Sequence, residues 1–180
     1  ITNATAKDRV LVIKPVANET GTATITVTAL DGKFGSTTNS FALTINAVND
    51  PPSFDLATNV LFVAVNAPLQ TVTNFAFNMS PGPPDEAAQT LSFLAEPIKP
   101  DFFARGPLGG PNVHVLQDGT LFFRVATNVT GTNVIRLTLS DSGSGVAPNI
   151  NKSPQRLFTI VVTAAPLTSP ANRLPSSGGN

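Results

Sequence analysis

The chain of 180 residues has no cysteine, no tryptophan and no tyrosine. Without cysteine it can form neither a disulfide nor a thiolate-ligated metal site. No apolar run approaches the roughly 20 residues that a membrane-spanning helix needs. Only 12% of the residues are charged, and 11 acidic side chains balance 11 basic ones, so no basic surface is available to hold a phosphate backbone. We expect neither a membrane span nor a nucleic-acid partner.

Catalytic motifs are also missing. The single histidine, His114, lies between two valines in a predicted strand, and no G-x-S-x-G elbow accompanies any serine. The glycines of residues 106–111 are interrupted by prolines, unlike those of a phosphate-binding loop. Carboxylates are present, but no tryptophan or tyrosine can stack on a sugar. We predict that the chain is not an enzyme and that it has no catalytic residue.

The sequence does contain a recurrent alternation of period two. In residues 22–30, TATITVTAL, apolar side chains fall on one face and threonines on the other, as in a half-buried strand. The alternation recurs at residues 40–46, 74–79, 135–139 and 158–162, and Gly and Pro separate these segments. No comparable window has a helical period. The pattern predicts an all-β fold built of antiparallel β-sandwiches.

The chain also repeats itself. At an offset of 110 positions, residues 10–32 fall on residues 120–142, with Ile25 on Ile135. The offset then grows to 117, and the additional residues lie in a polar loop, where insertions cost little. Many matches in one register indicate two copies of one unit.

The two copies are unequal, because the first has no counterpart of residues 51–110. We interpret residues 1–50 as the C-terminal half of a first sandwich repeat, residues 51–166 as a complete second repeat, and residues 167–180 as a Pro/Ser/Gly-rich tail. The two prolines of NDPP lack N–H donors and end strand pairing at the junction. A few strands with one apolar face do not stand alone in water. We expect an upstream segment, a neighbouring subunit or the second repeat to cover them.

Residues 26–54, TVTALDGKFGSTTNSFALTINAVNDPPSF, resemble the end of a cadherin-like or bacterial immunoglobulin-like repeat. The A-x-D-G turn, the Ser/Thr-rich hairpin and the V-N-D-P-P junction carry this resemblance, together with VNAPLQTV at 65–72 and QDGTLFF at 117–123. It covers residues 8–50 and 51–166. Such repeats occur in tandem in large secreted or surface-attached bacterial proteins, so the resemblance implies an extracellular or cell-surface location.

The resemblance also makes calcium a candidate cofactor. Cadherin repeats hold Ca²⁺ at their junctions through Asp, Asn and Glu oxygens, and a full site takes about six or more oxygens. This chain has fewer acids than the family, since Ala47 and Val65 stand where the family has acidic residues. In the alternative interpretation, Asp31 and Asp141 cap turns through Asx hydrogen bonds. The candidate ligands are Asn49, Asp50, Asp31, Asp141, Asp85 and Glu86.

Three further sets of residues have predicted roles. The apolar face of the first repeat forms a predicted interface with a second copy or a neighbouring repeat, through Ile25, Val27, Phe41, Leu43 and Ile45. The pairs Phe102–Phe103 and Phe122–Phe123 should each place one ring on either face of a strand. We expect the outer ring of each pair to pack beneath a long loop, and the alternative is an exposed patch that docks a neighbouring subunit. N-x-S/T triplets provide candidate glycosylation acceptors at Asn3, Asn18, Asn78, Asn128 and Asn151.

Two functions fit these observations. The first is a non-enzymatic structural module of a bacterial surface stalk, matrix or filament, assembled by strand complementation between subunits. A natural N-terminus at Ile1 would favour the polymer, and an upstream continuation would favour a long stalk. The second is an adhesin-type module that binds a carbohydrate or protein ligand through the loops 80–89 and 141–154.

Overall fold

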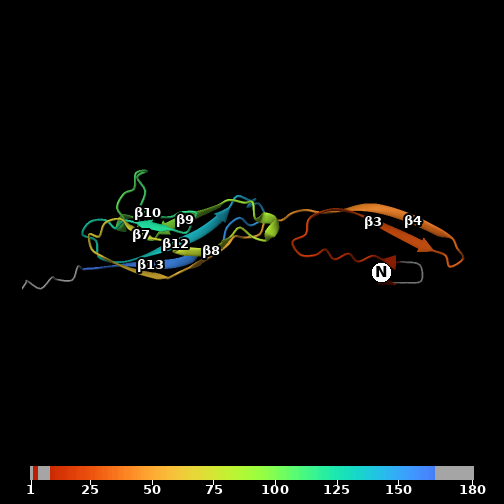
Figure 1. Ribbon diagram of the computed structural model, residues 1–180, viewed down its shortest axis with the longest axis horizontal. Helices are drawn as coiled ribbons and strands as arrows, with labels where there is room; N and C mark the ends of the chain where they lie inside the picture. The colour runs from red at the N-terminus through yellow and green to blue at the C-terminus, as the bar shows by residue number, and fades with distance from the viewer. Residues whose placement is uncertain (1, 4–8, 165–180) are drawn as a thin grey trace, which may run out of the picture.

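The computed structural model describes residues 2–3 and 9–164, and the predicted tail at 167–180 lies outside them. Figure 1 shows two parts along one axis: a β-sandwich, and a long hairpin that reaches away from it. Regular structure in the described residues consists of strands and the short 3-10 helices η1 (Pro84–Glu86) and η2 (Pro100–Phe102). None of the described helices has the length and hydropathy needed to cross a membrane. The all-β prediction is confirmed.

One layer of the sandwich is a four-stranded sheet in the order β6-β13-β12-β9. The central pair β12–β13 is antiparallel, β9 pairs antiparallel with β12, and β6 pairs parallel with β13. The strands of this sheet are β6 (Val60–Ala64), β9 (Leu91–Pro97), β12 (Gly131–Asp141) and β13 (Arg156–Thr163).

The other layer is formed by two smaller sheets. One has the order β10-β11-β7, and the other is the pair β5–β8. Their strands are β5 (Ser53–Leu56), β7 (Gln70–Val72), β8 (Ala76–Ser80), β10 (Val113–Val115) and β11 (Leu121–Phe123).

The core lies between these layers. Alternate residues of β12 are fully buried, and they pack in one cluster with residues of β11 and β13. Phe75 and Phe158 meet edge to face, with ring centroids 4.8 Å apart. Burying one such Leu, Ile or Phe side chain stabilises a fold by about 1.5–3 kcal/mol. The sandwich therefore encloses one continuous hydrophobic core.

Two details of the strand prediction are wrong. The alternation expected over residues 74–79 is interrupted at Asn78, whose φ of 51° accompanies a register shift between β8 and β5. Such a bulge redirects the strand. Phe102 lies in η2 rather than in a strand, and both Phe102 and Phe103 are buried, with an edge-to-face contact at 5.5 Å. Neither of these rings is available as a surface patch.

The hairpin consists of β3 (Gly21–Leu30) and β4 (Ser36–Ile45), paired from Gly21–Ile45 to Leu30–Ser36. Three hydroxyl pairs cross one of its faces, Thr22–Thr44, Thr26–Ser40 and Thr28–Thr38, at 2.9–3.2 Å. Ile25 and Phe41 pair directly on the other face. Within the described chain, β3 and β4 pair with each other and with no third strand. The short strands β1 (Thr2–Asn3) and β2 (Arg9–Val10) form a separate pair beside the hairpin (Figure 1).

The backbone of the hairpin corresponds to that of β12–β13. Gly21 pairs with Ile45, and Gly131 pairs with Val162, which lie 110 and 117 positions further along the chain. These are the two offsets of the sequence repeat. Gly21 and Gly131 both have a positive φ, as do Asn18 and Asn128, at 62° and 60°. The same hairpin thus occurs twice, once inside a sandwich and once without one. The division into repeats at residue 50 stays a prediction.

This correspondence allows a matched comparison of two isoleucines. We expect Ile135→Ala to lower the free energy of unfolding by about 3 kcal/mol, because Ile135 is completely buried. Ile25→Ala should cost less than about 1 kcal/mol, because Ile25 is only half-buried. Urea unfolding followed by circular dichroism measures both values, since the chain has no tryptophan to report by fluorescence. Equal losses at a dilution where the chain is monomeric would contradict this expectation, because they would mean that the chain's own residues cover the hairpin face.

Candidate functional site

The junction between hairpin and sandwich, residues 46–52, is centred on the buried Asn49. The backbone N–H of Asn49 donates to Asn149 Oδ1 at 2.8 Å, and its carbonyl accepts from the backbone N–H of Ile150 at 2.9 Å. Both partners belong to the loop between β12 and β13. The junction is therefore fastened to the sandwich through its backbone, as a strand would be.

The side chain of Asn49 is held as firmly as its backbone. Its Nδ2 donates to the carbonyl of Ile150 at 2.7 Å and to Asp141 Oδ1 at 3.2 Å, with a longer contact of 3.4 Å to the carbonyl of Asp50. Its Oδ1 accepts from Gln89 Nε2 at 2.7 Å. We call Asn49, Gln89, Asp141 and Ile150 the junction cluster.

A second contact ties the next junction residue to the loop after β8. The buried Glu86 accepts the backbone N–H of Asp50 on Oε1, at 2.8 Å. Its other oxygen, Oε2, is buried without a hydrogen-bond partner, and so are Asp141 Oδ2 and Gln89 Oε1. The junction thus contains acceptor oxygens that have a hydrogen-bond partner and buried acceptor oxygens that have none.

Two hollows flank the junction. One, of about 240 Å³, lies between the loops 80–89 and 141–154, and Asp85, Glu86, Ser144 and Asn149 are among its lining residues. The other, of about 260 Å³, lies on the hairpin side, where Glu19, Asp50 and Asp85 contribute carboxylates. The structure therefore brings together the two loops that the sequence proposed for ligand binding.

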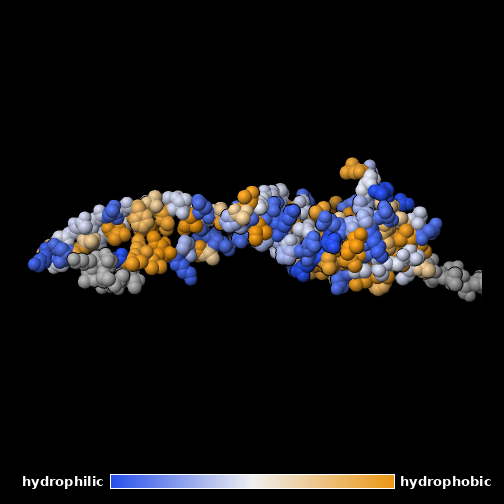
Figure 2. Space-filling model, turned by 180° about the vertical axis from the view of Figure 1, so that it is seen from behind, coloured by the Kyte–Doolittle hydropathy of each residue, from blue (hydrophilic) through white to orange (hydrophobic). Residues whose placement is uncertain are grey.

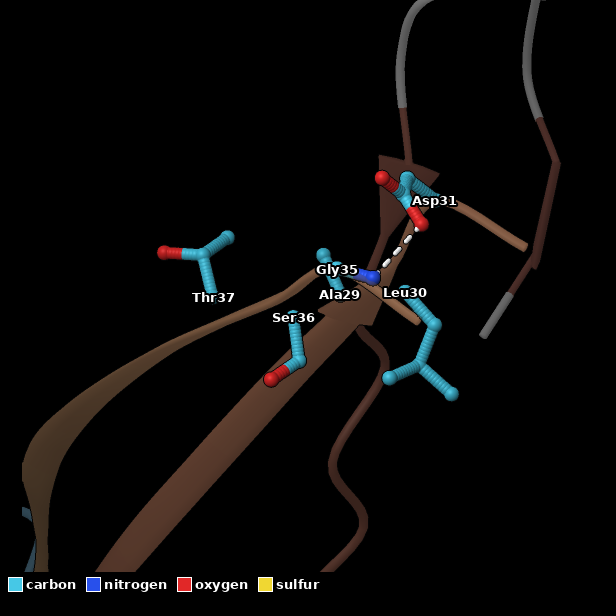
Figure 3. A pocket seen from close by; sticks show the side chains of 6 residues that line it. All are labelled: Ala29, Leu30, Asp31, Gly35, Ser36 and Thr37. Atoms are coloured by element: carbon cyan, nitrogen blue, oxygen red, sulfur yellow. Dashed lines mark hydrogen bonds between the residues drawn. The ribbon is translucent and has the colours of Figure 1, made fainter. Parts of the chain in front are cut away.

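Five of the six candidate calcium ligands gather at this junction: Asn49, Asp50, Asp85, Glu86 and Asp141. Asp31 does not. It lies at the opposite end of the hairpin, where Oδ1 accepts the backbone N–H groups of Lys33 at 2.7 Å and Gly35 at 2.9 Å. Figure 3 shows this carboxylate beside an open hollow at the hairpin tip, with the bond to Gly35 drawn. Asp31 thus caps the β3–β4 turn and cannot belong to a junctional ion site.

The residues at the junction do not fit a calcium ion. Nδ2 of Asn49, a donor, occupies the position that faces Asp141 Oδ1 and the Ile150 carbonyl, so these oxygens already have a partner. Asp141 Oδ1 also accepts the backbone N–H of Gly143 at 2.8 Å, as a turn cap does. In residues 9–164, no three Asp, Glu or His side chains form a group that could hold a metal. A hard cation needs oxygen ligands that converge on one point.

The predicted interface residues share the apolar face of the hairpin. Phe41 is 45% exposed and Val27 is 38% exposed, while Ile25, Leu43 and Ile45 are half-buried. The sequence analysis missed a second part of this surface, the segment from Val10 to Val16. Its exposed apolar residues are Val10, Leu11, Val12, Ile13 and Val16. Figure 2 shows hydrophobic residues collected over this end of the molecule.

The other candidate residues lie apart from the junction cluster. His114 is exposed on β10, between the buried Val113 and Val115. Asn18, Asn78 and Asn128 are exposed, whereas Asn151 is half-buried and Asn3 lies in β1. Asn78 donates to Asp55 Oδ2 at 3.1 Å, and Asn128 exchanges hydrogen bonds with Asn66. Glycosylation at these positions stays a prediction.

Gln89, Asn149 and Ile150 are members of the site that the sequence did not identify. All three lie in polar loops without periodicity, at 40, 100 and 101 positions from Asn49. Among the partners of Asn49, the sequence pattern indicates only Asp141, and it indicates it as an ion ligand.

No family model matches the chain, and no curated protein matches it. Among solved structures, it is similar to human protocadherin-24 EC1-2 in two crystal forms, at 15% identity and with TM-scores of 0.52 and 0.50. The matches cover 81% and 79% of this chain, and 67% and 66% of those chains. Residues 51–180 make up less than three quarters of the chain. Matches that cover 81% and 79% of the chain must therefore also include part of residues 1–50. This likeness shows that the chain has a cadherin-like fold.

Proposed function

We propose that the chain is a non-enzymatic structural module of an extracellular assembly, such as a stalk, matrix or filament at a bacterial surface. In this role the β3–β4 hairpin is completed by strands from a neighbouring subunit. The observation that carries the proposal is the hairpin itself, which exposes an apolar face and pairs with no further strand in the described residues.

The exposed apolar surface supports this role. Val12 and Val16 are 71% and 73% exposed, and Phe41 on the adjacent hairpin is 45% exposed. An isolated two-stranded hairpin is at most marginally stable in water. Contiguous apolar surface of this kind marks sites of protein association.

The edges of the hairpin support it as well. β3 and β4 contain no charged residue and no proline over 20 positions. Natural edge strands that avoid pairing use Lys, Pro or bulges to block an incoming strand, and this hairpin has none of these devices. Strand addition along such an edge provides backbone hydrogen bonds, while alternate side chains fill the open face.

The second hairpin supports a specific choice of complementing strands. β9 pairs antiparallel with β12, the counterpart of β3, and β6 pairs parallel with β13, the counterpart of β4. In β6, Val63 is buried and Leu61 is half-buried against the core. The expected complement of β4 is therefore a parallel strand with apolar residues at alternate positions.

A binding module is the second candidate function. It is favoured by the convergence of the loops 80–89 and 141–154 around one hollow of about 240 Å³. The lining contains Asp85, Gln89 and Ser144 but no aromatic side chain. Aromatic side chains usually provide much of the affinity at binding sites, so we rank this function second. A glycan array probed with the whole chain tests it.

Phe41→Lys tests assembly on the apolar face. We expect the unchanged chain to associate in a concentration-dependent way, and Phe41→Lys to abolish association, because a buried unpaired charge is costly. Thr127→Lys is the matched control, since Thr127 is exposed on the sandwich and the variant adds the same charge away from the hairpin. Sedimentation and electron microscopy measure the assembly. A monomer at high concentration, or equal behaviour of the two variants, would contradict this mode of assembly.

A synthetic peptide tests the strand complement directly. A peptide with the sequence of residues 57–66, ATNVLFVAVN, should slow hydrogen exchange of β4 amides by at least about tenfold, because a new ladder protects them. The control peptide carries Leu61→Asn and Val63→Asn, which leave the backbone unchanged and remove the apolar face. Protection by both peptides, or by neither, argues against side-chain-specific strand addition.

A further inference from the structure

We infer that the amide group of Asn49 takes the place of a cation at the junction, so that the joint between hairpin and sandwich is fastened without a divalent metal ion. The inference concerns the junction cluster alone and is independent of the proposed assembly.

The first step is the polarity of the atoms around Asn49. Three oxygens face Nδ2: the carbonyls of Ile150 and Asp50, and Asp141 Oδ1. A group surrounded by acceptors must be either a donor or a cation. Nδ2 carries two hydrogens, and the two shorter contacts, at 2.7 Å and 3.2 Å, use both. The opposite end of the same amide faces a donor, Gln89 Nε2. The carboxylate and the backbone carbonyl at Nδ2 can only accept, so they define the orientation of the amide.

The second step is burial. Asn49 is 8% exposed and Asp141 is 7% exposed, so water does not compensate a lost hydrogen bond at either residue. Gly143 lies against this amide, since a Cβ atom there would overlap Asn49 Oδ1. The space is therefore shaped for an amide at position 49, with both Nδ2 hydrogens and its Oδ1 engaged in hydrogen bonds.

The third step is what an acid would do in this position. A carboxylate at position 49 would place an anionic oxygen against Asp141 Oδ1 and the Ile150 carbonyl. Such a pair is repulsive unless a proton or a cation lies between the oxygens. Asparagine needs neither a proton nor a cation there, because the two hydrogens of Nδ2 bond to these oxygens directly. The unengaged oxygens Glu86 Oε2 and Asp141 Oδ2 are the remaining candidates for a cation, and the experiment addresses them by adding calcium directly.

The experiment compares thermal unfolding of the complete chain in excess chelator and in millimolar CaCl₂. We expect the melting temperature of the unchanged chain to be the same in both, and calorimetric titration with CaCl₂ to show no binding heat. Asn49→Asp should lower the melting temperature in chelator by about 5 °C or more, because a buried donor is lost and two carboxylates face each other. Asn46→Asp, an exposed change in the same linker, is the control and should shift it by less than about 1 °C.

Gln89→Glu provides a second variant in case Asn49→Asp does not fold. Glutamate is isosteric with glutamine, and position 89 is half-buried. The substitution places a carboxylate oxygen against Asn49 Oδ1. An amide-fastened joint should lose stability with or without calcium, whereas an ion site would gain a ligand and bind calcium more tightly. Stabilisation of the unchanged chain by calcium would overturn the inference. So would an Asn49→Asp chain that is as stable as the original in chelator.

Discussion

The constraint on which this molecule depends is that one face of a β-hairpin must be covered by apolar side chains. The chain meets this constraint once. In β12–β13 the inward residues Ile135, Leu137 and Phe158 are enclosed by the opposite layer, and both edges are paired. In β3–β4 the same register recurs, but the face is exposed and the edges are open. Because the two hairpins share one pairing register over the seven pairs of β12–β13, the difference lies in what surrounds them. Stability is therefore unevenly distributed along the chain.

The junction links these two regions, and the longer loop of the second copy has a specific part in it. The repeat offset grows from 110 to 117 between the paired strands, and the additional residues lie in the loop that contains Asn149 and Ile150. These two residues bind the backbone and side chain of Asn49. The first copy has a short turn at the equivalent position, capped by Asp31. The longer loop of the second copy therefore provides hydrogen-bond partners for Asn49, whereas the shorter loop of the first copy is a capped turn.

The sequence was most informative where a pattern persists over many residues. The alternation identified β3, β4, β12 and β13, and the repeat offsets match the observed pairing registers. It failed where one residue changes the local geometry, as at Asn78, where a left-handed residue inserts a bulge. The site was predictable only in part. Asn49 and Asp141 were selected as ion ligands, yet they bind each other, because the choice between an ion and an amide depends on the orientation of one side chain. Long-range partners in irregular loops, such as Gln89, leave no periodic signal.

A fixed joint and an open hairpin have complementary consequences for assembly. Binding of a strand costs the entropy of orienting both partners, and a preorganised acceptor lowers that cost. The junction cluster holds the linker against the sandwich, and the Thr–Thr and Thr–Ser pairs stiffen the hairpin beyond it. The hairpin extends away from the sandwich (Figure 1), so in the proposed assembly its open edges would be oriented before a partner binds. If an amide provides this rigidity, association depends on the apolar face and on backbone pairing, and the calcium concentration of the surroundings does not control it.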